Sequence, residues 1–257
     1  MKSRDLQRPD NSPWAPWVAL RAATPARIGL QNAGAAIATR DHLAFQRAHA
    51  EARDAVHERL DVASLAKGMR ALDLDILNLR SAAPDRHTYL LRPDLGRRLD
   101  DDSRAKLETL PRGFDIVFAV ADGLSARAVE RHAQNLLEAV LPKFRQSGWR
   151  IGPACIVEQG RVAIGDEIGF MLESSLAAVF IGERPGLSSP DSLGVYLTWA
   201  PALGRHDAER NCLSNIRVGG MSYAEAADRL FALCIAARQR KLTGVLLKDQ
   251  TPAFPVP

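Results

Sequence analysis

The segment from Phe114 to Phe144 constrains the fold more than any other part of the sequence. Almost every residue of Phe114–Ala121 (FDIVFAVA) is apolar, so this stretch offers no polar face to water. A strand that is apolar on both faces is typical of the centre of a parallel sheet covered by helices. A tight turn follows, and Ser125 is in position to cap an amphipathic helix over Ala126–Phe144. The segment therefore predicts a strand, turn and helix with a buried parallel strand.

The same alternation continues on both sides of this unit. Strands are expected at Ile76–Leu79, Thr88–Leu91, Ile151–Val157, Leu176–Ile181, Val195–Thr198 and Val245–Leu247, with helical segments at Leu95–Leu110, Val162–Glu173 and Met221–Lys241. Ser222 and Glu225 form a capping box at the start of the last helix. Strands that alternate with helices imply a mostly parallel sheet covered on both faces, which is a Rossmann-like three-layer α/β domain.

The residues ahead of the sheet predict a small helical domain. Thr39 can cap a long helix, and apolar residues recur on one of its faces from Phe45 to Leu60. A second helix is expected over Val62–Leu72 and a shorter helical segment over Pro25–Ala36. Before them lies a polar, proline-rich extension around Trp14 and Trp17, whose two tryptophans favour contact with a partner. The expected division is an irregular extension over residues 1–23, a helical domain over 24–88 and the Rossmann-like domain over 89–257.

Composition excludes several classes of protein. The chain has 257 residues, of which 46% are hydrophobic and 25% charged, as in ordinary globular proteins. Its apolar runs fall far short of the ~18 residues of a membrane span, and its N-terminus lacks the apolar core of a secretory signal. The net charge of +4 comes from basic residues scattered among acidic ones, with no basic stripe beside aromatics. We therefore expect a cytoplasmic protein that binds neither nucleic acid nor membrane.

The cysteines and histidines do not predict a metal site. The 3 cysteines, Cys155, Cys212 and Cys234, are widely separated, which argues against a disulfide framework or a thiolate cluster. Three of the histidines fall on the expected long helix about two turns apart, which is too far for one ion.

A ligand site is expected beyond the carboxyl ends of the strands, where open parallel sheets bind their ligands. Three segments should meet there, namely residues 122–125, 182–190 and 210–215. Glu183 is the favoured hydrogen-bond acceptor for a ligand, and a local ion pair with Arg184 is the alternative. Asp122 is either a carboxylate base or a turn residue. Cys212 is either a thiol nucleophile or a small residue that lets its segment approach a ligand.

Common catalytic signatures do not occur in the chain. It has no G-x-G-x-x-G, no G-x-x-x-x-G-K-[ST], no H-E-x-x-H and no G-x-S-x-G. Dinucleotide hydride transfer, P-loop phosphoryl transfer, zinc proteolysis and α/β-hydrolase chemistry thus lose their usual support.

Several long stretches resemble one known family. They are GERPGLSSPDSLGVYLTWAP (residues 182–201), DAERNCLSNIR (207–217), VADGLSARAVERHAQNLL (120–137), TPARIGLQNAG with AFQRAHAEARDAVH, and the final TGVLLKD. In this order they closely resemble the small (light) subunit of ethanolamine ammonia-lyase, from about Pro25 to Asp249.

The resemblance implies a reaction, a cofactor and a partner. The family's enzyme uses adenosylcobalamin to convert ethanolamine to acetaldehyde and ammonia by a radical route. Its large subunit is a TIM barrel that carries the substrate site, and several pairs of large and small subunits form one hetero-oligomer. The family's cobalamin contacts match Val162, Glu183 and Cys212 of this chain, and no catalytic residue falls on it.

The resemblance also implies base-on cobalamin, in which the protein does not ligate cobalt. Many other cobalamin domains carry D-x-H-x-x-G, whose histidine ligates the metal. Here Asp85–Leu90 has leucine in place of the glycine, and we interpret it as a chance match. Whether the assembly lies free in the cytosol or inside a bacterial microcompartment stays open.

Two other hypotheses remain beside the lyase subunit. The chain could be a stand-alone Rossmann-like module that holds a nucleotide or a corrinoid without catalysis. It could also be an independent enzyme that uses Cys212 or Asp122.

Overall fold

The fold is built around one six-stranded sheet. The computed structural model describes residues 15–30 and 32–248. The strands are β3 (Ile76–Arg80), β4 (Ile116–Ala121), β5 (Ile151–Glu158), β6 (Leu176–Gly182), β7 (Leu193–Trp199) and β8 (Arg210–Ile216), in the spatial order β3-β5-β4-β6-β7-β8. The first four strands in this order are parallel, and β7 and β8 are antiparallel to their neighbours. The predicted α/β class is confirmed, with a sheet that is mixed but mostly parallel.

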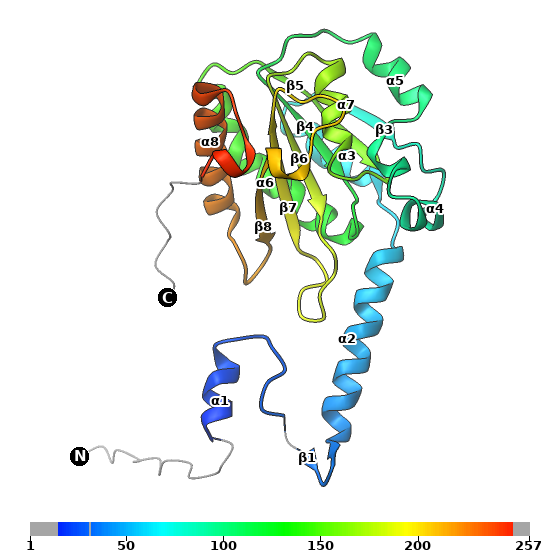
Figure 1. The fold of residues 1–257 in the computed structure, drawn as a ribbon, viewed down its shortest axis with the longest axis vertical. Helices are drawn as coiled ribbons and strands as arrows, with labels where there is room; N and C mark the ends of the chain where they lie inside the picture. Colours follow the sequence, from blue (N-terminus) through cyan, green and yellow to red (C-terminus); the bar gives the residue numbers. More distant parts are fainter. Residues whose placement is uncertain (1–14, 31, 249–257) are drawn as a thin grey trace, which may run out of the picture.

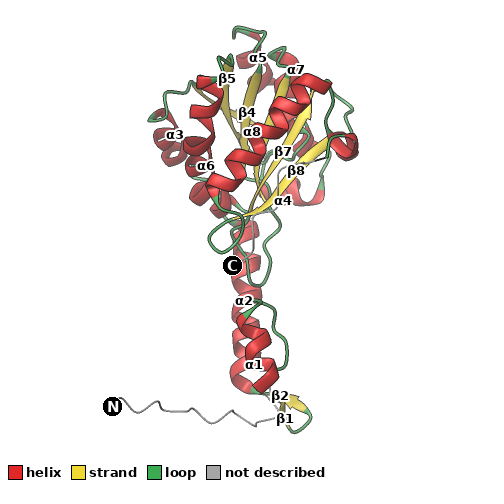
Figure 2. Cartoon of the chain, turned by 90° about the vertical axis from the view of Figure 1, so that its left-hand side faces the viewer, coloured by secondary structure: helices red, strands yellow, loops and turns green. Residues whose placement is uncertain are grey.

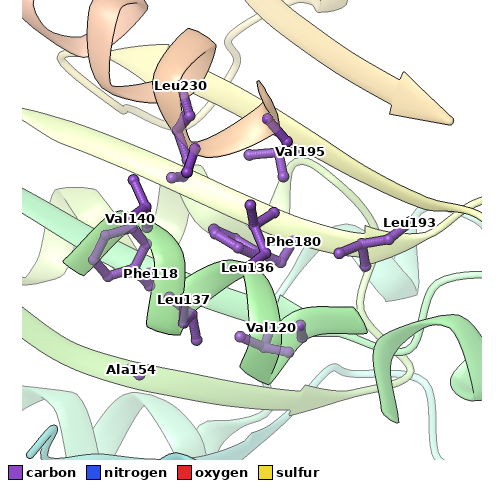
Figure 3. Close-up of a cluster of buried hydrophobic side chains, with 14 of the residues drawn as sticks. Phe118, Val120, Leu136, Leu137, Val140, Ala154, Phe180, Leu193, Val195 and Leu230 are labelled. Atoms are coloured by element: carbon purple, nitrogen blue, oxygen red, sulfur yellow. The ribbon is translucent and has the colours of Figure 1, made fainter. Parts of the chain in front are cut away.

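Helices cover both faces of this sheet. One face packs against α3 (Val62–Arg70), α6 (Ala126–Gln146) and α8 (Tyr223–Arg240), and the other against α5 (Asp101–Glu108) and α7 (Ile164–Met171). All six residues of β4 are buried, and they point alternately into the two layers. In Figure 3, Phe118 is drawn between Val140 and Leu137 of α6, which belong to the same buried cluster. Its ring makes edge contacts with Phe144 and Phe180, with centroids 5.7 and 5.8 Å apart.

Two expected strands are short helices instead. Thr88–Leu91 belongs to α4 (Arg86–Leu91), which begins where the Asp85 carboxylate accepts a hydrogen bond from the Thr88 amide at 2.8 Å. This N-cap fixes a helix in a stretch whose threonine, tyrosine and leucines suit a strand equally well. Val245–Leu247 overlaps the 3₁₀ helix η3 (Gly244–Leu246), whose first residue is a glycine at φ +85°. A third short turn, η1 (Leu95–Arg97), precedes α5.

The sheet also extends further than expected on one side. The segment 210–215, expected as part of the ligand site and not as a strand, forms most of the edge strand β8, and β7 therefore lies inside the sheet. Only three residues of β8 are buried, which is why its sequence lacks the apolar signature of the central strands. Between β7 and β8 lies the 3₁₀ helix η2 (Asp207–Glu209).

The N-terminal region does not show the expected helical domain. Helix α2 (Thr39–His57) projects away from the sheet (Figures 1 and 2) and buries only Ala48 and Ala55. Helix α3 packs into the layer of α6, and β3 already belongs to the sheet although it precedes residue 89. No separate hydrophobic core is therefore present among residues 15–30 and 32–57, which we call the N-terminal arm.

The start of the arm also differs from expectation. Residues 15–22 form a helix, α1 (Ala15–Ala22), where an irregular extension is expected. The segment 25–36, expected as helical, contains coil and a short hairpin of β1 (Asn32–Ala33) and β2 (Ala36–Ile37). Trp17 lies against Gly29 and keeps 41% of its surface exposed, and Trp14 falls outside the described residues. Over residues 15–30 and 32–248, no helix has the length and apolarity of a membrane span.

Candidate functional site

A cavity of about 310 Å³ opens at the carboxyl ends of the central strands. Its wall is made by the turns that follow β4, β5 and β6, together with side chains from α4, η1, β7 and η2. These residues are Tyr89, Arg97, Gly123, Leu124, Arg161, Val162, Ala163, Ile181, Gly182, Glu183, Arg184, Tyr196 and Asp207. We call this the strand-end cavity. Its position agrees with the expected crevice of an open α/β sheet.

Two glycines bring the turns after β4 and β6 into direct backbone contact. The Leu124 amide donates to the Gly182 carbonyl at 2.9 Å. A Cβ atom on Gly123 would lie 2.3 Å from that same carbonyl oxygen, and one on Gly182 would lie 2.1 Å from the Ser125 carbonyl. Gly123 also has φ +56°, a conformation that residues with a side chain rarely adopt. The edge of the cavity can therefore be built only with glycine at both positions.

Asp122 directly follows β4, and its side chain stabilises the turn after β5. Its carboxylate accepts hydrogen bonds from the amides of Gln159 (3.0 Å) and Gly160 (3.1 Å) and lies 3.4 Å from the guanidinium of Arg86. Burial raises the pKa of Asp122 to about 6, although Arg86 and the two amides act in the opposite direction. Because the carboxylate is 2% exposed and already accepts these bonds, the geometry favours the turn role over that of a catalytic base.

The stretch Asp85–Leu90 carries no metal-ligand arrangement. Its histidine, His87, is exposed on α4, whereas Arg86 and Tyr89 are buried. The Tyr89 hydroxyl donates to the Gly160 carbonyl at 3.2 Å. This segment therefore stabilises the turn after β5.

Val162 and Glu183 both line the strand-end cavity. Val162 is half-buried in the turn after β5, and Glu183 directly follows β6. The Glu183 Oε2 atom accepts hydrogen bonds from the Ser192 hydroxyl (2.5 Å) and the Asn215 amide (3.2 Å). Over the described part of the chain, Glu183 makes no ion pair with Arg184, and its Oε1 atom has no hydrogen-bond donor. Glu183 is thus held by one oxygen and can accept from a ligand with the other.

Cys212 lies next to the cavity rather than in its wall. It is an exposed residue of β8, paired in register with Tyr196 of β7, and Tyr196 lines the cavity. Partial removal from water and the nearby Glu183 carboxylate raise the pKa of the Cys212 thiol, although its contact with Tyr196 has the opposite effect. A thiol with a raised pKa holds little thiolate, so the environment does not favour a nucleophile.

Several lining residues do not follow from the sequence reasoning. Arg161 directly precedes Val162 and could have been found by extending the strand-end rule to β5. Tyr89 and Arg97 lie in the crossover that follows β3. The sequence predicts a strand at Thr88–Leu91 and a helical segment at Leu95–Leu110 there, so neither residue is expected at the ligand site.

Comparison with known proteins identifies the family. Residues 14–248 match the family described as ethanolamine ammonia-lyase light chain (EutC). The chain belongs to the ethanolamine ammonia-lyase small-subunit family. It is 52% identical over 250 residues to the ethanolamine ammonia-lyase small subunit of Pseudomonas paraeruginosa, covering 96% of this chain and 92% of that protein.

Other ethanolamine ammonia-lyase small subunits show similar identity. The one from Azotobacter vinelandii is 54% identical over 239 residues, covering 91% of this chain and 88% of that protein. The one from Xanthomonas campestris is 51% identical over 249 residues, with coverage of 95% and 92%. This chain is thus a subunit of a carbon–nitrogen lyase, and the description of the family as a small subunit implies a large-subunit partner. The family match includes the whole arm as well as the sheet.

Proposed function

We propose that this small subunit holds one edge of adenosylcobalamin against the large subunit of ethanolamine ammonia-lyase, which converts ethanolamine to acetaldehyde and ammonia. One observation carries the proposal. Val162 and Glu183, which the family resemblance nominates from separate segments, line a single cavity, and Cys212 lies beside its wall.

The lining residues fit the periphery of a corrinoid. The edge of the corrin ring carries amide groups, and Glu183 Oε1 has a free lone pair for such a donor. Val162 offers apolar contact, and Cys212 is small enough to let β8 approach the corrinoid closely. A corrinoid is far larger than about 310 Å³, so only part of it can enter this cavity, and the rest is left for the proposed partner to cover. As the family resemblance implies, the proposed binding is base-on, without a cobalt ligand from this chain.

The division of labour follows from this arrangement. When bound, adenosylcobalamin supplies the radical by homolysis of its cobalt–carbon bond. The residues of this chain bind and orient one edge of the cofactor and exclude water from it. None of them is assigned to act on ethanolamine. Substitution of these residues should therefore lower the affinity for the cofactor, with less effect on the rate of the chemical step.

The proposed partner is a TIM-barrel large subunit, in a hetero-oligomer of several large and small subunits. We place this assembly in the cytoplasm, either free or enclosed in a microcompartment.

Reconstitution tests the subunit role. The purified chain should show no ethanolamine turnover with adenosylcobalamin, and turnover should appear when the large subunit is added. Turnover by the chain alone would instead favour the independent enzyme. Tight corrinoid or nucleotide binding by the chain alone, with no effect on a large subunit, would favour the stand-alone module.

Glu183→Ala tests the cofactor role. In the reconstituted complex it should weaken adenosylcobalamin binding about tenfold, because a hydrogen bond to a charged acceptor is lost. The spectral change on cofactor titration measures this affinity. Glu138→Ala is a matched control, since Glu138 is exposed on α6 and does not line the cavity. Equal affinity of the Glu183→Ala complex and the control would remove Glu183 from the site.

A further inference from the structure

Two arginines on one wall of the strand-end cavity carry positive charge that no carboxylate neutralises. Within residues 15–30 and 32–248, neither Arg97 nor Arg161 makes an ion pair. Other arginines in the surrounding structure are paired: Arg86 with Asp122, Arg98 and Arg104 with Glu167, Arg205 with Glu209, and Arg210 with Asp166. Arg184, on the turn after β6, also lines the cavity and makes no ion pair within these residues, so the strand-end cavity as a whole carries uncompensated positive charge.

The two arginines lie on adjoining segments of backbone. The Arg161 amide donates to the Gly96 carbonyl at 2.8 Å, and Arg97 follows Gly96 directly. Helix α7 begins just after Arg161, so the positive end of its dipole adds to the charge of the same wall.

The guanidinium of Arg161 is held in a fixed position. It stacks over the Tyr89 ring at 4.6 Å, and one of its terminal nitrogens donates to the Tyr89 carbonyl at 3.1 Å. Tyr89 is itself 1% exposed and hydrogen-bonded to Gly160. The Nε atom of Arg161 is buried and has no acceptor within the described chain. A preorganised guanidinium with an unused donor is suited to bind a planar or tetrahedral oxyanion.

The two acidic residues of the cavity do not neutralise this wall. Glu183 accepts from Ser192 and Asn215, and Asp207 lies 3.6 Å from the Nε atom of Arg210. Within the described residues, neither carboxylate forms an ion pair with Arg97 or Arg161. Two like charges on one wall repel each other, and an anionic ligand group relieves that repulsion.

We propose that Arg97 and Arg161 form an anion subsite that binds a phosphodiester. This inference rests on the proposed function, because cobalamin carries one phosphodiester, in the loop that joins its nucleotide to the corrin ring. The arginine pair would fix that loop, and Val162 and Glu183 would contact the ring periphery. The subsite distinguishes complete cobalamin from corrinoids that lack the nucleotide.

Two corrinoids test the subsite. Cobalamin has the phosphodiester, and cobinamide lacks it together with the nucleotide base. Binding of each is measured by the absorbance change on titration into the reconstituted complex of large and small subunits. Arg97→Gln and Arg161→Gln should each lower cobalamin affinity about tenfold, the typical effect of one charge-assisted hydrogen bond, and leave cobinamide affinity unchanged. Arg92→Gln is the control, because Arg92 is exposed, close in sequence and outside the cavity wall.

A conservative variant separates charge from shape. Arg97→Lys keeps the positive charge and should retain most of the cobalamin affinity that Arg97→Gln loses. Since Arg97 is exposed and makes no ion pair within the described residues, these two variants should fold normally even if Arg161→Gln loosens the turn.

The outcomes separate this proposal from the proposed function. If the wild-type complex binds neither corrinoid, the proposed cofactor role fails. If the wild-type complex binds cobalamin but the glutamine variants weaken both corrinoids equally, or weaken neither, the anion subsite is overturned and the cofactor role stands. Equal loss in Arg97→Lys and Arg97→Gln would likewise overturn it, because charge would then not be what the ligand recognises.

Discussion

Helices α6 and α2 are nearly equal in length, 21 and 19 residues, but different interactions hold them in place. Ten residues of α6 are buried against the sheet, whereas α2 buries only Ala48 and Ala55. The arm is joined to the rest of the chain by contacts at its base, such as the Arg86 bond to the Val56 carbonyl at 2.6 Å, and by the Ser188 bond to the Pro25 carbonyl at 3.2 Å. Hydrophobic burial thus stabilises the α/β domain, residues 62–248, and contributes little to the arm.

The arm also leaves large apolar side chains in water. Its exposed members are Trp17, Val18, Leu20, Ile37, Leu43 and Phe45. A surface pair at i,i+4, Arg47 with Glu51 at 2.8 Å, is the kind of contact that supports α2 instead of a core, and such pairs contribute only ~0.3–0.5 kcal/mol. The comparison teaches that a helical periodicity in the sequence shows an apolar face without showing what covers it.

The largest expected effect lies at the centre of the domain. Phe118→Ala should lower the free energy of unfolding by about 3–5 kcal/mol, because it opens a cavity among the rings of Phe144 and Phe180. Urea unfolding followed by circular dichroism measures the change. A loss below ~1 kcal/mol would mean that the domain is not held by this core.

An intermediate effect is expected at the turn after β5. Asp122→Asn should cost about 1–3 kcal/mol at pH 7, because one amide loses its acceptor and Arg86 loses its counter-charge. Asp94→Asn, at an exposed pair, is the control.

The same residue predicts a pH dependence. The pKa of Asp122 is raised in the folded protein from 3.8 to about 6, so the folded state binds the proton more tightly than the unfolded state. The contribution of Asp122 to stability is therefore complete below pH ~4, falls between pH ~4 and ~6, and is constant above pH ~6. Unfolding experiments across this range should show that decline in the wild type and not in Asp122→Asn. An identical pH profile for both proteins would contradict the raised pKa.

The smallest effect is expected on the arm. Phe45→Ala should change the free energy of unfolding by less than about 1 kcal/mol, because the side chain is already 43% exposed. It is the matched partner of Phe118→Ala, with the same atoms removed from the other region. A loss as large as that of Phe118→Ala would show that the arm has a core of its own and would end the contrast between the two regions.

Local signals in the sequence predict the centre of the fold well. The strand and helix of β4 and α6 were expected within two residues of their ends, since an apolar run, a turn and a serine cap all act locally. Helix α8 begins after Ser222, whose hydroxyl accepts from the Glu225 amide as the capping box predicts. Edge strand β8 and the uncovered arm were not predictable in this way, because their structure depends on which other segments they contact.

The residues of the candidate site also differ in how far the sequence predicts them. The rule for strand ends selects Glu183 and the glycine turn after β4 from sequence alone. Val162 came only from the family resemblance, and its role stays a proposal, as do those of Glu183 and Cys212. Arg97 required the structure, because the Gly96 bond to Arg161 joins segments more than sixty residues apart in sequence.

The backbone contact between Gly123 and Gly182 has a mechanical consequence. Because the turns after β4 and β6 touch without an intervening side chain, neither can shift without moving the other. That rim of the cavity is therefore stiff. Arg97, which also lines the cavity, instead has a long, exposed side chain that can move aside. A bulky ligand would thus enter by displacing side chains such as this one, while the backbone contact between the two turns stays fixed.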